Sequence, residues 1–272
     1  MANSPFVYGI KTKLIAFIKD DNENLIEEGY YVYFNVNGNL VEAEYNSTIS
    51  GYEAEYVFNT LGLVEIFTVC PSINITDNQG INTTVTKSTE LTASSVITTY
   101  GVAKKLVVTL RDSDNVLANK KVTVKVDKIS KTFTTNSKGQ ISVDVSSLTP
   151  KTYTASIKFA GDNYYSSSSK SVKVNVKKAT PKLTAKAKSF KKSVKTKKYC
   201  ITLKTNINKV MKKVKVTLKV KGKTYTAKTN NKGKATFKIT KLTKKGTYKA
   251  IINYKGNSYY NKVTKKVNIK IK

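Results

Sequence analysis

The stretch Lys121-Val122-Thr123-Val124-Lys125-Val126 sets the fold class, because polar and apolar residues alternate in it at every step. It returns 94 residues later as Lys215-Val216-Thr217-Leu218-Lys219-Val220. Alternation with a period of two indicates β-strands with one buried and one wet face. Helical spacing is not sustained for three turns anywhere in the chain. The sequence therefore predicts an all-β protein that contains an internal repeat.

Two further matches keep nearly the same offset as this pair of strands. Gly161-Asp162-Asn163-Tyr164-Tyr165 returns as Gly256-Asn257-Ser258-Tyr259-Tyr260, at an offset of 95. Leu91-Thr92-Ala93 returns as Leu183-Thr184-Ala185, at an offset of 92. The drift between offsets indicates small loop insertions within two domains of about the same length.

A weaker copy of the repeat precedes these two domains. The residues from Lys13 to Asp20 resemble those from Lys105 to Asp112, at an offset of 92. Asn37-Gly38 lies between apolar strands, which is a strong hairpin signal, and the third copy has Lys221-Gly222 there. Only about a dozen residues precede Lys13, so this copy either begins inside its first strand or is built short. We expect three domains, at 1–86, 87–178 and 179–272.

The third copy contains seven stretches with strand character, each bounded by turn residues. They lie at 183–188, 199–204, 214–220, 223–229, 234–239, 247–254 and 263–271. About seven antiparallel strands in a domain of this size is typical of an immunoglobulin-like β-sandwich. The predicted fold is therefore three such sandwiches in tandem.

A tyrosine at the start of the sixth strand supports this fold. Tyr153 and Tyr248 each follow a Leu-Thr turn, and the first copy has no tyrosine there. In immunoglobulin-like domains, the hydroxyl of such a residue bonds back to upstream backbone and forms a tyrosine corner. We expect both residues to be largely buried in equivalent corners.

Two features of the second and third copies resemble those of known protein families. The turn at Asn136–Gly139, placed between a leading strand and the motif at Gly161–Tyr165, resembles the group 3 bacterial Ig-like repeats. The Lys-rich stretch from Thr180 to Lys272 resembles the C-terminal repeats of adhesin-like surface proteins of methanogenic archaea. The resemblance covers 87–272 well and 11–86 loosely. It implies an archaeal, surface-exposed array of sandwich domains with a role in cell adhesion or wall association, and it carries no catalytic residues.

Charge is distributed very unevenly among the three predicted domains. Residues 1–86 hold 3 basic and 11 acidic side chains, and residues 87–178 hold 16 and 6. Residues 179–272 hold 30 lysines and no acidic residue. A domain with this charge repels itself and attracts anions. We expect the lysine-rich domain to associate with an anionic cell-wall polymer or a host-surface glycan.

Two interpretations of the lysines remain open. One is an anion-binding surface, and the other is a solvated surface in an organism with AT-rich codons, since the chain has a single arginine, Arg111. Sequence-specific recognition of nucleic acid favours arginine forks, so we do not expect it. Nonspecific binding of acidic glycan or nucleic acid is the alternative function.

Few other residues suggest chemistry. The chain has no histidine, which excludes imidazole-dependent catalysis, and two cysteines cannot build a Cys-only zinc site. Cys70 and Cys200 lie in non-adjacent domains, and we expect Cys200 on an outer face and no role for either. Asn46, Asn74 and Asn82 begin possible glycosylation sequons. We expect no catalytic residue, no cofactor and no metal.

The location of the protein follows only in part from the sequence. No run of 18 apolar residues exists, so we expect no membrane span. The start of the chain, Met1 to Pro5, lacks a signal peptide, so the chain is either cytoplasmic or a fragment of a longer exported protein. Together with the resemblance, we expect a fragment of a non-enzymatic, extracellular or cell-surface adhesin-like protein, organised as a monomeric array.

Overall fold

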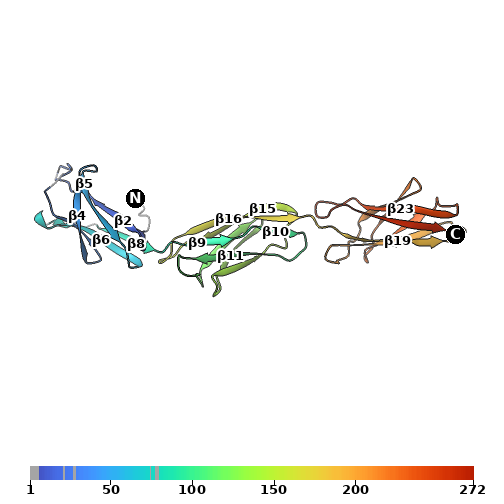
Figure 1. Cartoon of the computed structure of the whole chain (residues 1–272), viewed down its shortest axis with the longest axis horizontal. Coiled ribbons are helices and arrows are strands. Elements are labelled where there is room, and N and C mark those ends of the chain that lie inside the picture. The colour runs from blue at the N-terminus through green and yellow to red at the C-terminus, as the bar shows by residue number, and fades with distance from the viewer. Residues whose placement is uncertain (1–5, 21, 27–28, 74, 77–79) are drawn as a thin grey trace.

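A computed structural model shows three β-sandwich domains in a row (Figure 1). The structure describes residues 6–20, 22–26, 29–73, 75–76 and 80–272. The one helical segment in these ranges is a 3-10 turn at Pro71–Ile73. Each sandwich has its own hydrophobic core, and these cores draw on residues within 14–85, 91–176 and 199–271. The predicted fold class, tandem immunoglobulin-like sandwiches, is confirmed.

The second domain consists of eight strands in two sheets. They are β9 (Glu90–Ala93), β10 (Val96–Thr99), β11 (Lys105–Arg111), β12 (Lys121–Val126), β13 (Ile129–Thr134), β14 (Gln140–Asp144), β15 (Lys151–Phe159) and β16 (Ser168–Lys177). One sheet has the order β10-β16-β15-β12-β13, and the other has the order β14-β11-β9.

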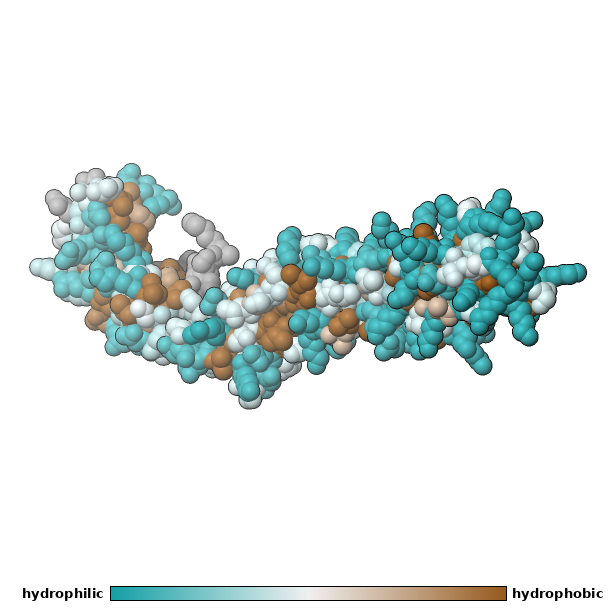
Figure 2. All heavy atoms as spheres, turned by 45° about the vertical axis from the view of Figure 1, so that its right-hand side comes forward, coloured by the Kyte–Doolittle hydropathy of each residue, from teal (hydrophilic) through white to brown (hydrophobic). Residues whose placement is uncertain are grey.

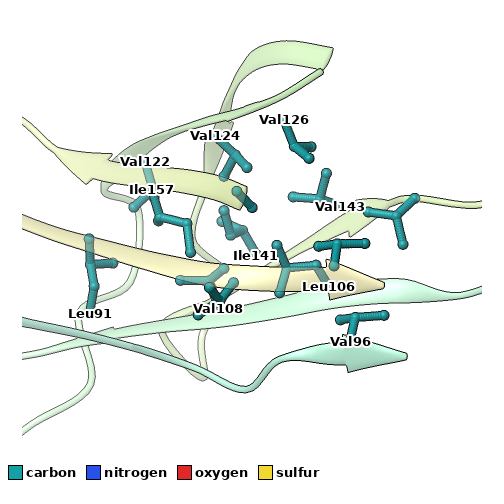
Figure 3. Packing of buried hydrophobic residues seen from close by; sticks show 14 of the residues in the cluster. Leu91, Val96, Leu106, Val108, Val122, Val124, Val126, Ile141, Val143 and Ile157 are labelled. Carbon is teal, nitrogen blue, oxygen red and sulfur yellow. The ribbon is translucent and has the colours of Figure 1, made fainter. Parts of the chain in front are cut away.

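The alternation in β12 builds the core of this domain. Its three valines are at most 2% exposed, and the residues between them face outward. Ile157 of β15 lies beside them, and Leu106 of β11 meets them from the other sheet (Figure 3). Full burial of one such side chain contributes roughly 1.5–3 kcal/mol, so the inward half of each strand holds the sandwich together.

The third domain repeats this architecture. Its strands are β17 (Lys182–Thr184), β18 (Lys188–Phe190), β19 (Lys197–Lys204), β20 (Lys215–Val220), β21 (Lys223–Lys228), β22 (Lys234–Ile239), β23 (Gly246–Tyr254) and β24 (Val263–Ile271). The sheet orders are β18-β24-β23-β20-β21 and β17-β19-β22, which match the second domain strand for strand.

The leading strand predicted at 183–188 is in fact two strands, one in each sheet. β17 pairs antiparallel with β19, whereas β18 pairs parallel with β24. The second domain divides its leading segment in the same way. By crossing between the sheets, this segment pairs with an edge of each and covers both. The second and third domains therefore have eight strands and one parallel pair each, not seven strands that are all antiparallel.

The first domain is a variation on the same plan. Its strands are β1 (Phe6–Val7), β2 (Lys11–Ala16), β3 (Val32–Val36), β4 (Asn39–Asn46), β5 (Gly51–Val57), β6 (Gly62–Cys70), β7 (Ile75–Thr76) and β8 (Ile81–Thr86). The first part of β4 pairs with β3, and its end pairs with β5, so one strand joins the two sheets. β1 pairs parallel with β8, as β10 does with β16.

The hairpin predicted at Asn37-Gly38 is confirmed. Val36 pairs with Asn39, which leaves a two-residue turn, and Asn37 and Gly38 have φ of 47° and 90°. Lys221 and Gly222 form the equivalent turn of the third domain, with φ of 45° and 74°. Positive φ at both positions matches the twist of the flanking strands, and asparagine and glycine tolerate it best.

Candidate functional site: the domain junctions and the basic surface

The junction between the second and third domains is formed by the repeated Tyr-Tyr motif. Ala179 follows β16, is fully buried, and forms a parallel bridge with Tyr260. Its N–H donates to the carbonyl oxygen of Tyr259 at 3.1 Å, and the N–H of Asn261 donates to its carbonyl oxygen at 2.8 Å. The loop that joins β23 to β24 therefore holds the linker by backbone bonds on both sides.

Two other residues of this motif fix the shape of the loop. The side-chain oxygen of Asn257 accepts hydrogen bonds from the N–H groups of Tyr259 and Tyr260, at 2.9 and 2.8 Å. Gly256 has φ of 84°, and a Cβ there would lie 2.7 Å from the carbonyl oxygen of Tyr260. The glycine and the asparagine are thus required by the turn that presents the two tyrosines to the linker.

An aromatic contact joins the two domains directly. Tyr100 directly follows β10. Its ring packs against those of Tyr259 and Tyr260, with centroid distances of 5.0 and 5.6 Å. The side-chain amide of Asn206 donates to the carbonyl oxygen of Tyr100 at 3.3 Å. Burial, and then the nearby Tyr100 hydroxyl, raise the pKa of Tyr260. These contacts restrict the rotation of one domain against the next.

The junction between the first and second domains is built in the same way. Lys87 takes the place of Ala179: its N–H donates to the carbonyl oxygen of Tyr164 at 2.8 Å, and its own carbonyl accepts from Ser166 at 2.9 Å. Its Nζ lies 3.3 Å from the carboxylate of Asp114 and 5.5 Å from the ring of Tyr8. The hydrogen bond that the Lys87 ammonium donates to the Asp114 carboxylate is the main cause that raises the pKa of Lys87.

Asp162 takes the place of Asn257 and adds an ion pair. Its carboxylate accepts from the N–H groups of Tyr164 and Tyr165, and lies 2.6 Å from the Nζ of Lys120. Burial acts to raise the pKa of Asp162, but the hydrogen bonds from Lys120 and from the two N–H groups outweigh it and lower the pKa of this carboxyl below its usual range.

The role of these loops was missed by sequence reasoning. The sequence analysis recognised that the motif is repeated but assigned it no role at a domain junction. In the structure, Tyr164 and Tyr259 are 53% and 38% exposed and lie at junctions. The signal that could have revealed this is that Lys87 and Ala179 each stand just after the last strand of a repeat, ahead of a domain that carries the motif.

The second candidate surface covers the third domain. All of its lysines except Lys197 are exposed, because they occupy the outward positions of the strands and the loops. Figure 2 shows this end of the molecule largely covered by hydrophilic residues. The domain has no acidic side chain, so no lysine in it has a carboxylate partner within the domain. The result is a dense positive charge on both sheets and at both ends.

Lys197 is the exception, and sequence reasoning did not single it out. It is 1% exposed and starts the inward-facing set of β19 that continues with Tyr199 and Ile201. Its Nζ donates to the carbonyl oxygen of Val194 at 2.6 Å. The period-two pattern, extended one step before Tyr199, would have placed this lysine inside.

The two predicted corner tyrosines lie at equivalent positions but differ in burial. The hydroxyl of Tyr153 donates to the carbonyl oxygen of Thr149, and that of Tyr248 donates to the carbonyl oxygen of Lys244, both at 3.0 Å. Tyr153 is 6% exposed, whereas Tyr248 is partly buried and packs against the edge of the third domain's core. The hydroxyl of Thr149 also bonds to Tyr153, and the lysine that replaces it in the third domain makes no such bond.

The possible glycosylation residues lie in the first domain. Asn46 is half-buried at the end of β4, and its side-chain oxygen accepts from the N–H of Thr48 at 2.9 Å. Asn82 is exposed on β8. Asn74 lies outside the described residues.

The two cysteines are not bonded to each other. Cys70 is buried in β6, and Cys200 is exposed on β19, as expected from its outward position. Within the ranges that the structure describes, no group of three or more acidic or cysteine side chains is placed to hold a metal ion. None of the described segments is a helix long and apolar enough to cross a membrane.

Comparisons with known proteins give a limited result. Neither a scan of protein-family models nor a search of curated proteins finds a match. Among solved structures, a bacterial ice-binding adhesin is 12% identical over 97% of this chain and 92% of its own, with a TM-score of 0.32. The titin domains Z1Z2 are 13% identical over 69% of this chain and 98% of their own, with a TM-score of 0.40. The adhesin InvE of Yersinia pseudotuberculosis is 15% identical over 65% of this chain and 58% of its own, with a TM-score of 0.28. Because these scores are low, the fold assignment rests on the sheets and cores of this chain.

We predict that Tyr100→Ala loosens the junction between the second and third domains without unfolding either. Two aromatic contacts of about 0.5–1.5 kcal/mol each are lost, while the backbone bonds to Ala179 remain. Distances between a label on the exposed Cys200 and one on a cysteine introduced at Ser130 should become more broadly distributed. Tyr164→Ala, which alters the other junction, should leave this distribution unchanged. An unaltered distribution in Tyr100→Ala would contradict the assigned role.

We also predict that acid destabilises the second domain through Asp162, whose carboxylate shapes the loop at the junction with the first domain. Since the pKa of this carboxyl is lowered in the folded chain, it stabilises the fold above about pH 4, and the contribution is lost as the pH falls through the lowered value. Asp162→Asn, which reproduces Asn257, should make the second domain's melting temperature fall less between pH 6 and about 3. Asp127→Asn, at an exposed turn, should leave the acid sensitivity of the wild type intact. If the melting temperature falls equally with pH in the wild type and in Asp162→Asn, the assigned role of Asp162 is wrong.

Proposed function

We propose that the chain is a non-enzymatic, adhesin-like structural protein of the cell surface. The three sandwiches form a stalk, and the two clamped junctions keep it extended. The resemblance of residues 87–272 to group 3 Ig-like repeats and to archaeal adhesin-like proteins supports an extracellular location. The chain then contributes length and a charged end rather than chemistry.

One observation carries this proposal: every lysine of the third domain but one is exposed, and no acidic residue accompanies them. An anionic polymer that lies against such a surface releases its condensed counterions, which favours binding without a shaped pocket. An anionic cell-wall polymer or a host-surface glycan is the partner that fits. The first domain, with 11 acidic side chains against 3 basic ones, is repelled by the same surface and forms the outward end.

A second candidate function is a nonspecific polyanion-binding protein that takes acidic glycan or nucleic acid alike. The spread of the lysines favours it, because Lys219 on one sheet and Lys238 on the other are both exposed. Sequence-specific nucleic-acid binding is not part of either proposal, since the chain has one arginine.

The proposal predicts that the full chain binds anionic polymers in a strongly salt-dependent way. Affinity for a sulfated glycan and for a teichoic-type polymer should fall by at least about a hundredfold between about 50 and 200 mM salt. A neutral polysaccharide of similar length is the matched control and should not bind. Titration by calorimetry or surface plasmon resonance measures this. An affinity that does not change with salt, or a preference for the neutral polymer, would contradict the electrostatic proposal.

A further inference from the structure

A groove lies on the outer face of the third domain's five-stranded sheet. It crosses β20, β23 and β24 close to the end that faces the second domain, and encloses about 720 Å³. Thr217, Asn253 and Thr264 form its floor, and Lys215, Lys255 and Lys262 lie along one side. This site is distinct from the general charge of the domain, because it combines shape, hydrogen-bonding groups and lysines.

The strand register brings the floor residues into a single row. Thr217 lies opposite Thr226 on one neighbouring strand and opposite Asn253 on the other, and Asn253 lies opposite Thr264. The row thus spans four strands, or about 14 Å. The hydroxyl of Thr264 donates to the side-chain oxygen of Asn253 at 2.6 Å. This bond orients the amide, and its NH₂ group has no partner among the described residues.

Lysines flank this neutral row on both sides. Lys215 pairs with Lys228, and Lys255 and Lys262, which lie just beyond the paired ends of β23 and β24, line the groove together with Lys215. On the other side, Lys219 and Lys266 both lie opposite Ile251, one on each neighbouring strand. Each flanking row is about 7 Å from the floor row, since residues two apart in a strand share a face.

The second domain has the same strands but a different surface at this place. Lys158 pairs with Thr123 and so occupies the position of Asn253. Ala160 and Ser167 occupy the positions of Lys255 and Lys262. A long side chain therefore stands in the middle of the row, and of the three lysines on the groove's side only the one equivalent to Lys215, Lys121, is present. The combination found in the groove belongs to the third domain alone.

We propose that this groove binds a linear anionic polysaccharide, which deepens and rests on the proposed function of the third domain. Hydroxyl and amide groups in the floor suit the hydroxyls of a sugar chain, and ammonium groups on both sides suit its carboxylates or sulfates. Nucleic acid fits less well, because stacking of bases needs an exposed aromatic face. The one aromatic residue of the groove, Tyr254, is 4% exposed.

The test compares two charge-matched triple variants of the full chain. Lys215→Gln, Lys255→Gln and Lys262→Gln together remove three charges from the groove. Lys198→Gln, Lys234→Gln and Lys238→Gln remove three from the outer face of the other sheet. With heparin oligosaccharides of defined length as the probe, the groove variant should bind at least about tenfold more weakly than the wild type, and the control variant within about twofold.

A third variant separates the groove from charge density. Asn253→Lys introduces the residue that the second domain has at this position, Lys158. The variant adds a positive charge, but it removes the amide from the floor of the groove and places a long side chain there. If the groove binds the glycan, this variant should bind several-fold more weakly in spite of its higher charge. Circular dichroism checks that each variant keeps its β-structure, and the core residues beneath are untouched.

The outcomes distinguish this proposal from the proposed function. Equal losses in the two triple variants, or tighter binding by Asn253→Lys, would overturn the groove and leave the general charge attraction intact. Single-stranded DNA that binds as tightly as heparin, with the same loss in the groove variant, would overturn the assignment to a polysaccharide. If the wild-type chain binds no anionic polymer even at low salt, both proposals fail.

Discussion

The structure depends on one constraint: in a strand, neighbouring residues must face opposite sides of the sheet. In this chain the inward positions are mostly aliphatic or aromatic, and in β20 and β22 of the third domain two of the three outward residues are lysines. The alternation that places apolar side chains in each core therefore also determines where the lysines lie on the surface. Burial of the apolar half must offset the mutual repulsion of 30 lysines, and a sandwich with two closed layers supplies that burial in a short chain.

Both domain junctions are built from the same short sequence motif. One short motif, with a glycine at positive φ and an aspartate or asparagine that bonds two backbone N–H groups, shapes a loop at the entrance of both the second and the third domain. That loop holds one linker residue by two backbone hydrogen bonds, and a tyrosine from the preceding domain packs on it at the second junction. The domains are thus held in series, with negative charge at one end of the array and positive charge at the other.

Much of this arrangement could be predicted from the sequence, because it follows from local patterns. Period-two alternation gave the strands and the inward residues, and Asn37-Gly38 gave a hairpin that the structure confirms. The split of 183–188 could not be predicted, since Leu183, Ala185 and Ala187 continue the alternation without a break where the segment changes sheets. The clamp on Ala179 joins residues about eighty positions apart, and no local pattern encodes such a contact. The groove was missed for the same reason: its row appears only once the register between β20, β23 and β24 is known.

The central claim is that the exposed lysines of the third domain, which have no carboxylate partner within the domain, bind an anionic polymer. The most direct measurement is the free energy of unfolding of that domain in the full chain, followed through an amide probe in its core, as an anionic polysaccharide is added at constant ionic strength. The account predicts that the free energy rises steadily with the polymer, while a probe in the first domain reports no change. No stabilisation of the third domain, or equal stabilisation of the acidic first domain, would contradict it.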